Sequence, residues 1–192
     1  MKLENVFYNI VRLFSVSKKK GVYSMPYQAS DIAKWFLAKN KSEMIEHETS
    51  GDDYEVYEGI THLKLQKLLY FAQGIYLALN NDVLFSDEIV AWQHGPVVKC
   101  VYDEYKHNGR NPIDIELNNN DEKLINFIEN DARALETLRL TYDNFAIYTA
   151  WQLREMTHQQ GTPWDDAIEN NGLNSVINTR LIRKYFLDEV IE

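Results

Sequence analysis

The chain has 192 residues, enough for one domain of ordinary size or two small ones. Hydrophobic residues make up 45% and charged residues 26%, a composition typical of soluble globular proteins. The net charge of −9 argues against a general nucleic-acid-binding protein, because such proteins neutralise phosphates with a basic face. The single cysteine, Cys100, excludes an internal disulfide and a cysteine-rich zinc module.

Targeting and membrane signals are absent from the sequence. No apolar run approaches the roughly 20 residues that cross a bilayer, and the N-terminal segment lacks the small-residue cleavage site of a secretory signal. We therefore expect a protein of the reducing cytoplasm, with no membrane partner. The sequence also predicts no metal and no cofactor.

The N-terminal segment predicts an amphipathic helix followed by a basic linker, Lys18-Lys19-Lys20. Large apolar residues recur there at steps of three and four, namely Leu3, Val6, Phe7, Ile10, Leu13 and Phe14. We expect residues 1–24 to be an addition to a main domain of residues 25–192. The stripe would be buried against its own domain, a second copy or a protein partner. We predict that it completes a groove against the domain and adds to the partner-facing surface.

The next two segments are predicted to be a helix and a loop. Either Ser24 or Ser30 would cap a helix that carries Trp35 and Phe36 on one face. Residues 43–58 contain seven acidic residues and no Lys or Arg. We therefore predict an acidic, solvated loop over residues 40–60.

The middle of the chain predicts a central helix and a small β element. Thr61 is a good N-cap for a strongly apolar helix that ends near Asn80. Residues 89–92 are predicted to be extended, and Gly95-Pro96 to start another helix that buries Cys100 as an inert thiol. Because residues 112–117 alternate apolar and polar side chains, we expect a short strand there, paired with residues 90–92.

The C-terminal third predicts further helices. One long helix is expected over residues 121–144, and a capping box at Thr149 and Gln152 starts the next. Thr162-Pro163 starts a short helix in which Trp164 anchors the core, and Asn178 or Thr179 caps the last helix. The sequence thus predicts a mainly α protein, a single compact domain of about seven helices with a short two-stranded β element.

Catalytic signals are weak. The five histidines include no pair at the spacing of a zinc-binding helix, and the chain has no glycine-rich phosphate loop. His94 and His158 each adjoin a predicted helix start, where a histidine either ties a loop to the helix or acts as a catalytic group. We favour the tie, since no nucleophile or acid is identifiable beside either histidine.

Four stretches, in order along the chain, carry a resemblance to a known family. They are residues 63–74 (LKLQKLLYFAQG), residues 91–98 (AWQHGPVV) followed by Val101-Tyr102, residues 153–158 (LREMTH) followed by Pro163-Trp164, and a closing pattern of Ile177, Ile182 and Tyr185-Phe186. Together they resemble the motifs of the Panacea domain, found in SocA-like antitoxins and phage-associated proteins. The resemblance covers roughly residues 27–187. It implies an antitoxin-type binding domain encoded beside a toxin, without enzyme activity.

The resemblance marks a set of motif residues as the candidate binding site: Gln66, Lys67, Tyr70, Trp92, His94, Gly95, Pro96, Thr157, His158 and Trp164. The three polar residues on the predicted central helix either satisfy buried backbone groups or face a ligand. We favour the first role, so that the shared motifs hold the fold and the variable segments choose the partner.

Our leading hypothesis is an antitoxin that neutralises a cognate toxin by direct contact, because an acidic protein gains encounter rate and selectivity with a more basic partner. Sequestration of the toxin and its delivery to a protease both remain open. Rival hypotheses are a proteolytic adaptor, a membrane-surface adaptor using the N-terminal helix, and a hydrolase-like enzyme using His94 or His158.

Overall fold

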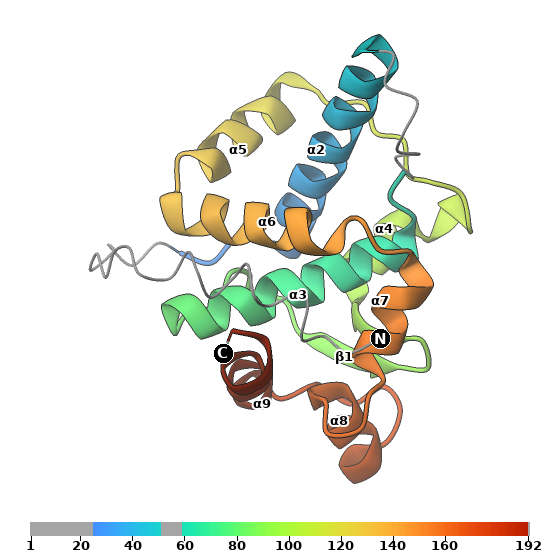
Figure 1. Cartoon of the computed structure of the whole chain (residues 1–192), viewed down its shortest axis with the longest axis vertical. Coiled ribbons are helices and arrows are strands. Elements are labelled where there is room, and N and C mark those ends of the chain that lie inside the picture. Colours follow the sequence, from blue (N-terminus) through green and yellow to red (C-terminus); the bar gives the residue numbers. More distant parts are fainter. Residues whose placement is uncertain (1–24, 51–58, 192) are drawn as a thin grey trace.

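The computed structural model describes residues 25–50 and 59–191 (Figure 1). The predicted N-terminal stripe, with its basic linker, lies outside the described residues. In chain order the described elements are α2 (Ala29–Ser50), α3 (His62–Asn80), β1 (Ile89–Trp92), β2 (Gly95–Val98), α4 (Lys99–Tyr105), η1 (Lys106–Asn108), α5 (Asn119–Glu129), α6 (Ala132–Phe145), α7 (Ala150–Thr157), α8 (Pro163–Asn171), α9 (Thr179–Tyr185) and η2 (Phe186–Val190). The prediction of a mainly α fold with one small two-stranded sheet is confirmed.

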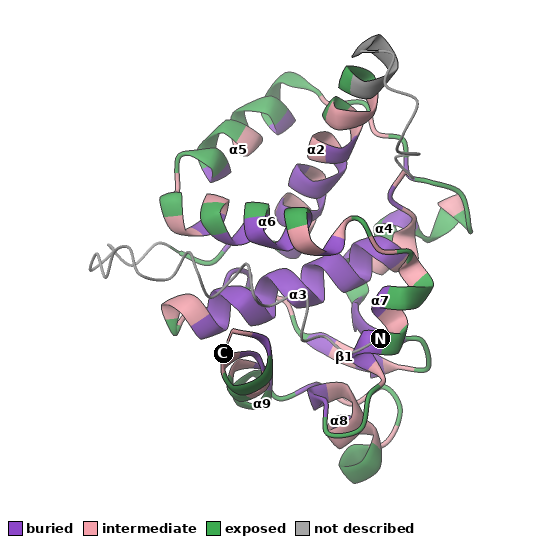
Figure 2. Ribbon diagram, in the orientation of Figure 1, coloured by how far each residue is buried: buried purple, intermediate pink, exposed green. Residues whose placement is uncertain are grey.

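Helix α3 crosses the middle of the molecule. The helices α2, α5 and α6 lie on one side of it, and the β hairpin, α8 and α9 lie on the other (Figure 1). Every residue of α3 from Lys64 to Ala78 is buried (Figure 2). Thr61 is its N-cap, as predicted, and Asn81 ends it in the left-handed conformation at φ 53°. None of the described helices combines the length and the apolarity that crossing a bilayer requires.

Two glutamines of this central helix hydrogen-bond to the backbone of the segment that follows it. The Gln73 side chain accepts from the amides of Leu84 (2.9 Å) and Phe85 (3.3 Å) and donates to the Phe85 carbonyl (3.0 Å). The Gln66 Oε1 accepts from the amide of Val98 at 2.7 Å. A helix buried on all sides normally carries few polar residues, and here they satisfy backbone groups that have no partner within regular structure.

The predicted helix start at Gly95-Pro96 is wrong. Residues Gly95–Val98 form β2, which pairs antiparallel with β1 from Ile89↔Val98 to Trp92↔Gly95, and α4 begins only at Lys99. Gly95 has φ +101°, which no residue of a right-handed helix adopts. A proline in a short edge strand is tolerated, because it interrupts little of the ladder.

The predicted strand over residues 112–117 is also wrong. The strand β1 pairs with β2 on one side and makes an isolated bridge to Val176 on the other. In residues 112–117, the amide of Ile113 instead donates to the Ile60 carbonyl at 2.8 Å. Residues 113–117 belong to no strand. The alternation reflects one apolar face, with Ile113 buried and Glu116 exposed, rather than a paired strand.

Helix α2 also departs from the prediction at both ends. It begins at Ala29, so Ser30 lies inside the first turn, and the Ala29 amide donates instead to Asp87 Oδ2 at 2.8 Å. The predicted acidic loop over residues 40–60 is wrong for its first part, because α2 continues to Ser50. Glutamate has good helix propensity, and Glu43 pairs with Lys39 at 2.8 Å one turn earlier. Residues 51–58 lie outside the described part of the chain.

The long helix predicted over residues 121–144 is two helices. Asp131 separates α5 from α6 in an extended conformation, and its Oδ1 accepts from the amides of Arg133 and Ala134. An aspartate before an apolar repeat can either cap a new helix or lie inside a continuous one. The periodicity of the apolar residues does not distinguish these two roles. The predicted capping box at Thr149 and Gln152 is confirmed, as are the N-caps at Thr162 and Asn178.

Cys100 is exposed, which corrects the prediction of a buried thiol. Because α4 starts four residues later than predicted, Cys100 falls in its first turn and faces outward. Its Sγ donates to Asp87 Oδ1 at 3.2 Å. Partial burial of the sulfur, followed by this hydrogen bond, raises the pKa of the thiol to about 11.

We predict that Gly74→Ala destabilises the protein. A Cβ at Gly74 would lie 2.3–2.5 Å from three ring atoms of Phe186, so the substitution overpacks the contact between α3 and η2 at a cost of roughly 1–3 kcal/mol. Helix propensity alone would give the opposite sign, a gain of about 1 kcal/mol. Urea unfolding measures the change. In the Gly74→Ala background, Phe186→Leu should cost less than it does in the wild type; a stabilised Gly74→Ala protein would contradict the packing.

Candidate functional site

Most of the predicted site residues meet at the β1–β2 hairpin. Two come from α3, one from the end of β1, two from the start of β2, two from the end of α7 and one from α8. We call this set the hairpin clamp; its members are Gln66, Lys67, Trp92, Gly95, Pro96, Thr157, His158 and Trp164. Tyr70 lies further along α3, edge-to-face with Phe186, and His94 is exposed in the hairpin turn.

Lys67 is the most unusual member of the hairpin clamp. Its side chain is fully buried, and its Nζ donates to the carbonyl oxygen of Pro96 at 2.9 Å. None of the ion pairs found among the described residues involves it. Burial, and then the neighbouring Arg154, lower the pKa of Lys67 well below its ordinary value. A single hydrogen bond therefore ties a desolvated amine to the start of β2.

Gly95 leaves the space that the amine needs. A Cβ there would lie 2.5 Å from Lys67 Nζ and 2.8 Å from Thr157 Oγ1, and φ at Gly95 is +101°. Glycine is thus required twice, once by the backbone conformation and once by the close approach of the two side chains. The hairpin turn and the central helix fit together only around this missing side chain.

His158 and Trp164 hold the other side of the hairpin. The His158 ring lies over the Trp164 ring, with centroids 3.8 Å apart. Its Nε2 contacts the Gln93 carbonyl at 3.1 Å and its Nδ1 the Arg154 carbonyl at 2.8 Å, while Trp164 Nε1 donates to the Trp92 carbonyl at 2.9 Å. Burial lowers the pKa of His158. These contacts join α7 and α8 to the hairpin backbone, as expected of a histidine that ties a loop to a helix end.

Two polar atoms in the fully buried part of α3, from Lys64 to Ala78, have no hydrogen-bond partner. They are Gln66 Nε2 and Tyr70 Oη, on side chains that are each 2% exposed. Gln66 satisfies the Val98 amide with its oxygen, as predicted for a structural role. Tyr70 is enclosed by aromatic rings, and burial raises its pKa well above the usual value. Neither residue presents its polar atom to solvent.

Comparison with known proteins gives the same motifs a family. Residues 65–165 match the sequence profile of the family described as antitoxin SocA-like, Panacea domain. The chain belongs to this family. Antitoxin SocA of Caulobacter vibrioides is 32% identical over 139 residues, which cover 67% of this chain and 71% of that protein. No solved structure matches the chain.

The segment shared with the SocA-like family contains the whole hairpin clamp, whereas α2, α9 and η2 lie outside it. Two motif glycines, Gly74 and Gly95, lie in the family-matched segment. A Cβ at Gly74 on α3 would lie 2.3 Å from the Phe186 ring, and a Cβ at Gly95 would lie 2.5 Å from Lys67 Nζ on α3. The SocA-like motifs in this chain are thus, for the most part, the residues that join the central helix to the elements around it.

Of the two histidines considered for catalysis, His158 lies beside a hydroxyl that is already engaged. Thr157 Oγ1 lies 3.1 Å from His158 Nδ1, the spacing of a nucleophile and its base, but this hydroxyl donates to the Arg154 carbonyl at 2.8 Å and its side chain is 1% exposed. His94 is exposed in the turn. Within residues 25–50 and 59–191, no three His, Cys, Asp or Glu side chains are placed to share a metal ion.

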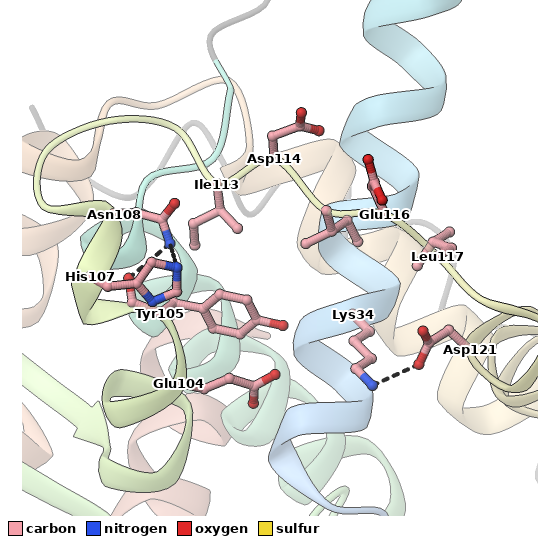
Figure 3. A pocket seen from close by; sticks show the side chains of 11 residues that line it. Lys34, Glu104, Tyr105, His107, Asn108, Ile113, Asp114, Glu116, Leu117 and Asp121 are labelled. Carbon is pink, nitrogen blue, oxygen red and sulfur yellow. Dashed lines mark hydrogen bonds and ion pairs between the residues drawn. The ribbon is translucent and has the colours of Figure 1, made fainter.

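A separate cavity of about 370 Å³ lies between α2, the α4–η1 segment and residues 113–117 (Figure 3). Lys34 and Asp121 form an ion pair of 2.6 Å at one end, and Glu104 and Glu116 line it elsewhere. The sequence did not predict this pocket. Its lining comes from four segments that only the fold brings together, and the one local signal, the alternation over residues 112–117, was interpreted as a strand.

We predict that Lys67→Met changes how stability depends on pH. The folded-state pKa of Lys67 is depressed below the unfolded value, so between these two pKa values the unfolded chain binds more protons. This residue therefore makes the wild type gain stability as the pH rises toward 10.5, and lose it as the pH falls. Denaturant unfolding of both proteins from pH 7 to pH 10 should show the wild type gaining relative to Lys67→Met.

The control for this experiment is Lys184→Met, at an exposed lysine that pairs with Asp188. Its hydrogen bond to Asp188 raises its folded-state pKa above 10.5, so its contribution to stability is fully present below that pH. The difference between wild type and Lys184→Met should therefore stay constant from pH 7 to pH 10. A constant difference between wild type and Lys67→Met across the range would contradict a depressed pKa at Lys67.

We predict that Trp164→Ala costs about 2–4 kcal/mol, at the lower end of large aromatic truncations because Trp164 is half-buried rather than fully enclosed. Trp164→Phe keeps a ring against His158 and loses only the hydrogen bond to Trp92, so it should cost about 1 kcal/mol. Thermal unfolding of the isolated protein measures both. An unchanged melting temperature for Trp164→Ala would move this residue from the clamp to a binding surface.

Proposed function

We propose that this protein is an antitoxin that neutralises a cognate toxin by direct protein–protein contact. The observation that carries the proposal is membership of the SocA-like Panacea family, together with 32% identity to an antitoxin over 71% of that protein's length. Under this proposal the protein acts in the cytoplasm, where a neighbouring gene supplies the toxin. Residues 25–192 form the binding domain, and residues 1–24 are an addition to it.

The hydrogen bonds of the hairpin clamp support a binding protein rather than an enzyme. Its polar atoms are directed at backbone carbonyls and amides of the same chain, at 2.7–3.1 Å. The nearest approach to a nucleophile, Thr157, is buried and engaged. A protein whose shared motifs are used in holding its fold acts through its surface, and partner choice then falls to residues outside the motifs.

The surface offers features that suit a protein partner. Trp151 is 59% exposed, with the Arg154 guanidinium 4.6 Å from its ring centroid, and Ile147 just before α7 is 75% exposed. Tryptophan and arginine are the side chains that most often anchor protein interfaces. The net charge of −9 favours a partner more basic than this chain, because complementary potentials speed association and reject wrong partners.

Co-expression tests the proposal. The protein encoded by the adjacent reading frame should stop growth when expressed alone, and growth should return when this chain is expressed with it. The two proteins should also elute together in gel filtration. Absence of rescue at matched expression, or rescue without a complex, would contradict neutralisation by direct contact. Rescue that disappears in a protease-deficient host would indicate a proteolytic adaptor instead.

We predict that deletion of residues 1–20 leaves a folded but less effective antitoxin. The apolar stripe from Leu3 to Phe14 needs a surface to cover it, since so short a helix is marginal alone in water. If that surface includes the toxin, rescue should fall by about tenfold or more, the equivalent of one lost contact of roughly 1.4 kcal/mol.

Helicity, melting temperature and growth rescue are measured together for the truncated and the full chain. The matched control replaces Lys18, Lys19 and Lys20 by glutamine and leaves the stripe intact. Full rescue by the truncated protein at equal expression would contradict an interface role. Wholesale unfolding would show that the stripe belongs to the core of its own domain.

A further inference from the structure

The cavity between α2, α4 and residues 113–117 has an apolar floor and an acidic rim. Ile113 and Tyr105 are buried at 9% and 7% exposure and form the floor, while the exposed Glu104 and Glu116 form the rim. Figure 3 shows these side chains. Its volume of about 370 Å³ is near the lower end for ligand pockets. The cavity has room for a long side chain rather than for a structural element of a partner.

The charges of the pocket do not balance. Asp121 is neutralised by Lys34 at 2.6 Å, and Asp114 by Lys41 at 2.8 Å. No ion pair found in the described part of the chain neutralises Glu104 or Glu116. Lys34 also lies near Glu104, which adds to the raised pKa of this lysine. Four carboxylates line the cavity and only two lysine amines pair with any of them, so the cavity keeps an excess of negative charge.

The pocket is also rich in acceptors. The Tyr105 hydroxyl points into the cavity between Glu104 and Lys34 (Figure 3). Burial, and then Glu104, raise the pKa of Tyr105, so the hydroxyl stays protonated and donates a hydrogen bond to Glu104. Its oxygen lone pairs are then presented to the cavity, beside the carboxylates. The one cationic side chain of the lining, that of Lys34, is already bound to Asp121.

We propose that this pocket binds a basic side chain, an arginine or a lysine, of the toxin. The inference rests on the proposed function and names the chemistry of one contact within it. The apolar floor takes the aliphatic stem and the rim takes the charged head, which is how long cationic side chains are buried. A guanidinium has five donors and no acceptor, so it suits a site with more carboxylates than cations.

The geometry favours an organic cation over a metal ion. No three acidic or histidine side chains in the described part of the chain are placed to share a metal, so the carboxylates of this pocket are spread too widely to coordinate one. A planar guanidinium or an ammonium on a long stem spans such a spacing with separate hydrogen bonds. The acidic rim would steer a basic toxin to this face and align it there.

The first test uses a small probe in place of the toxin. The full chain, labelled with ¹⁵N and ¹³C, is titrated with N-acetyl-arginine amide, and N-acetyl-glutamine amide and Mg²⁺ serve as neutral and metal controls. Saturable shifts confined to Tyr105, Ile113 and Leu117 are expected with the arginine probe alone, with a Kd in the millimolar range of a single contact, about 1–10 mM. Absence of such shifts would overturn the proposal.

The matched variants keep the change in net charge the same. Glu104→Gln/Glu116→Gln alters the rim, and Glu129→Gln/Glu169→Gln alters two exposed glutamates elsewhere, on α5 and α8. The rim pair should lose the shifts, and the control pair should keep them. If the shifts appear only after deletion of residues 1–20, the lysine run of the chain itself is the occupant, and the assignment to the toxin is overturned.

The second test measures the toxin complex by titration calorimetry at two salt concentrations. The rim pair should raise the Kd about tenfold or more and flatten its salt dependence, while the control pair should change the Kd less than about threefold. Equal effects of the two pairs on a complex that the wild type forms would overturn the pocket and leave the proposed function standing. Failure of the wild type to bind the toxin would overturn both the pocket and the proposed function. The melting temperature of each variant is measured alongside, so that unfolding is excluded as the cause of weaker binding.

Discussion

Hydrogen bonds from the central helix to the backbone of the next segment are the interaction on which the rest of the structure depends. Gln66, Lys67 and Gln73 project from a helix that is buried on every side, and each ends on a backbone group between residues 84 and 98. Burial in a low dielectric makes such bonds costly to break, because both partners would be left without water. The hairpin is thereby fixed, and α7 and α8 then pack against it.

This dependence explains why the family motifs are scattered along the sequence and yet meet in space. The LKLQ stretch supplies the donors and acceptors, the HGP stretch supplies the backbone that receives them, and the TH and PW stretches close the far side. A substitution in one motif removes a partner from another. The motifs are therefore coupled through the contacts that hold the fold. Surface residues outside these contacts can change without loss of the fold.

Local signals in the sequence predicted much of the fold and less of its detail. Thr61, Thr149 and Thr162 were identified as N-caps because capping chemistry is local, and the mainly α class followed from long periodic segments. The errors arose where a distant residue decides the outcome. Lys67 and Thr157 fill the space that a side chain at Gly95 would need, and the start of α2 is capped by Asp87.

The candidate site shows the same division. The hairpin clamp was predicted as a set of residues through the family resemblance, but its geometry was not, because no local pattern reveals that a lysine amine reaches a carbonyl 29 residues away. The acidic pocket was not predicted at all. Glu104, Glu116 and Asp121 look like ordinary solvated acids in the sequence, and only the packing of α2 against residues 113–117 gives them a shared cavity.

The exposed thiol of Cys100 makes the molecule convenient to study. It is the sole cysteine of the chain, it sits in the first turn of α4, and its raised pKa keeps it protonated at neutral pH. A fluorophore or spin label attached there at alkaline pH would report from a single known position. Labelling replaces the S–H that donates to Asp87, but Asp87 still accepts from the Ala29 amide at the start of α2. The label would therefore lie where α4 meets the start of α2, and it would sense whether the two helices stay together when a partner binds.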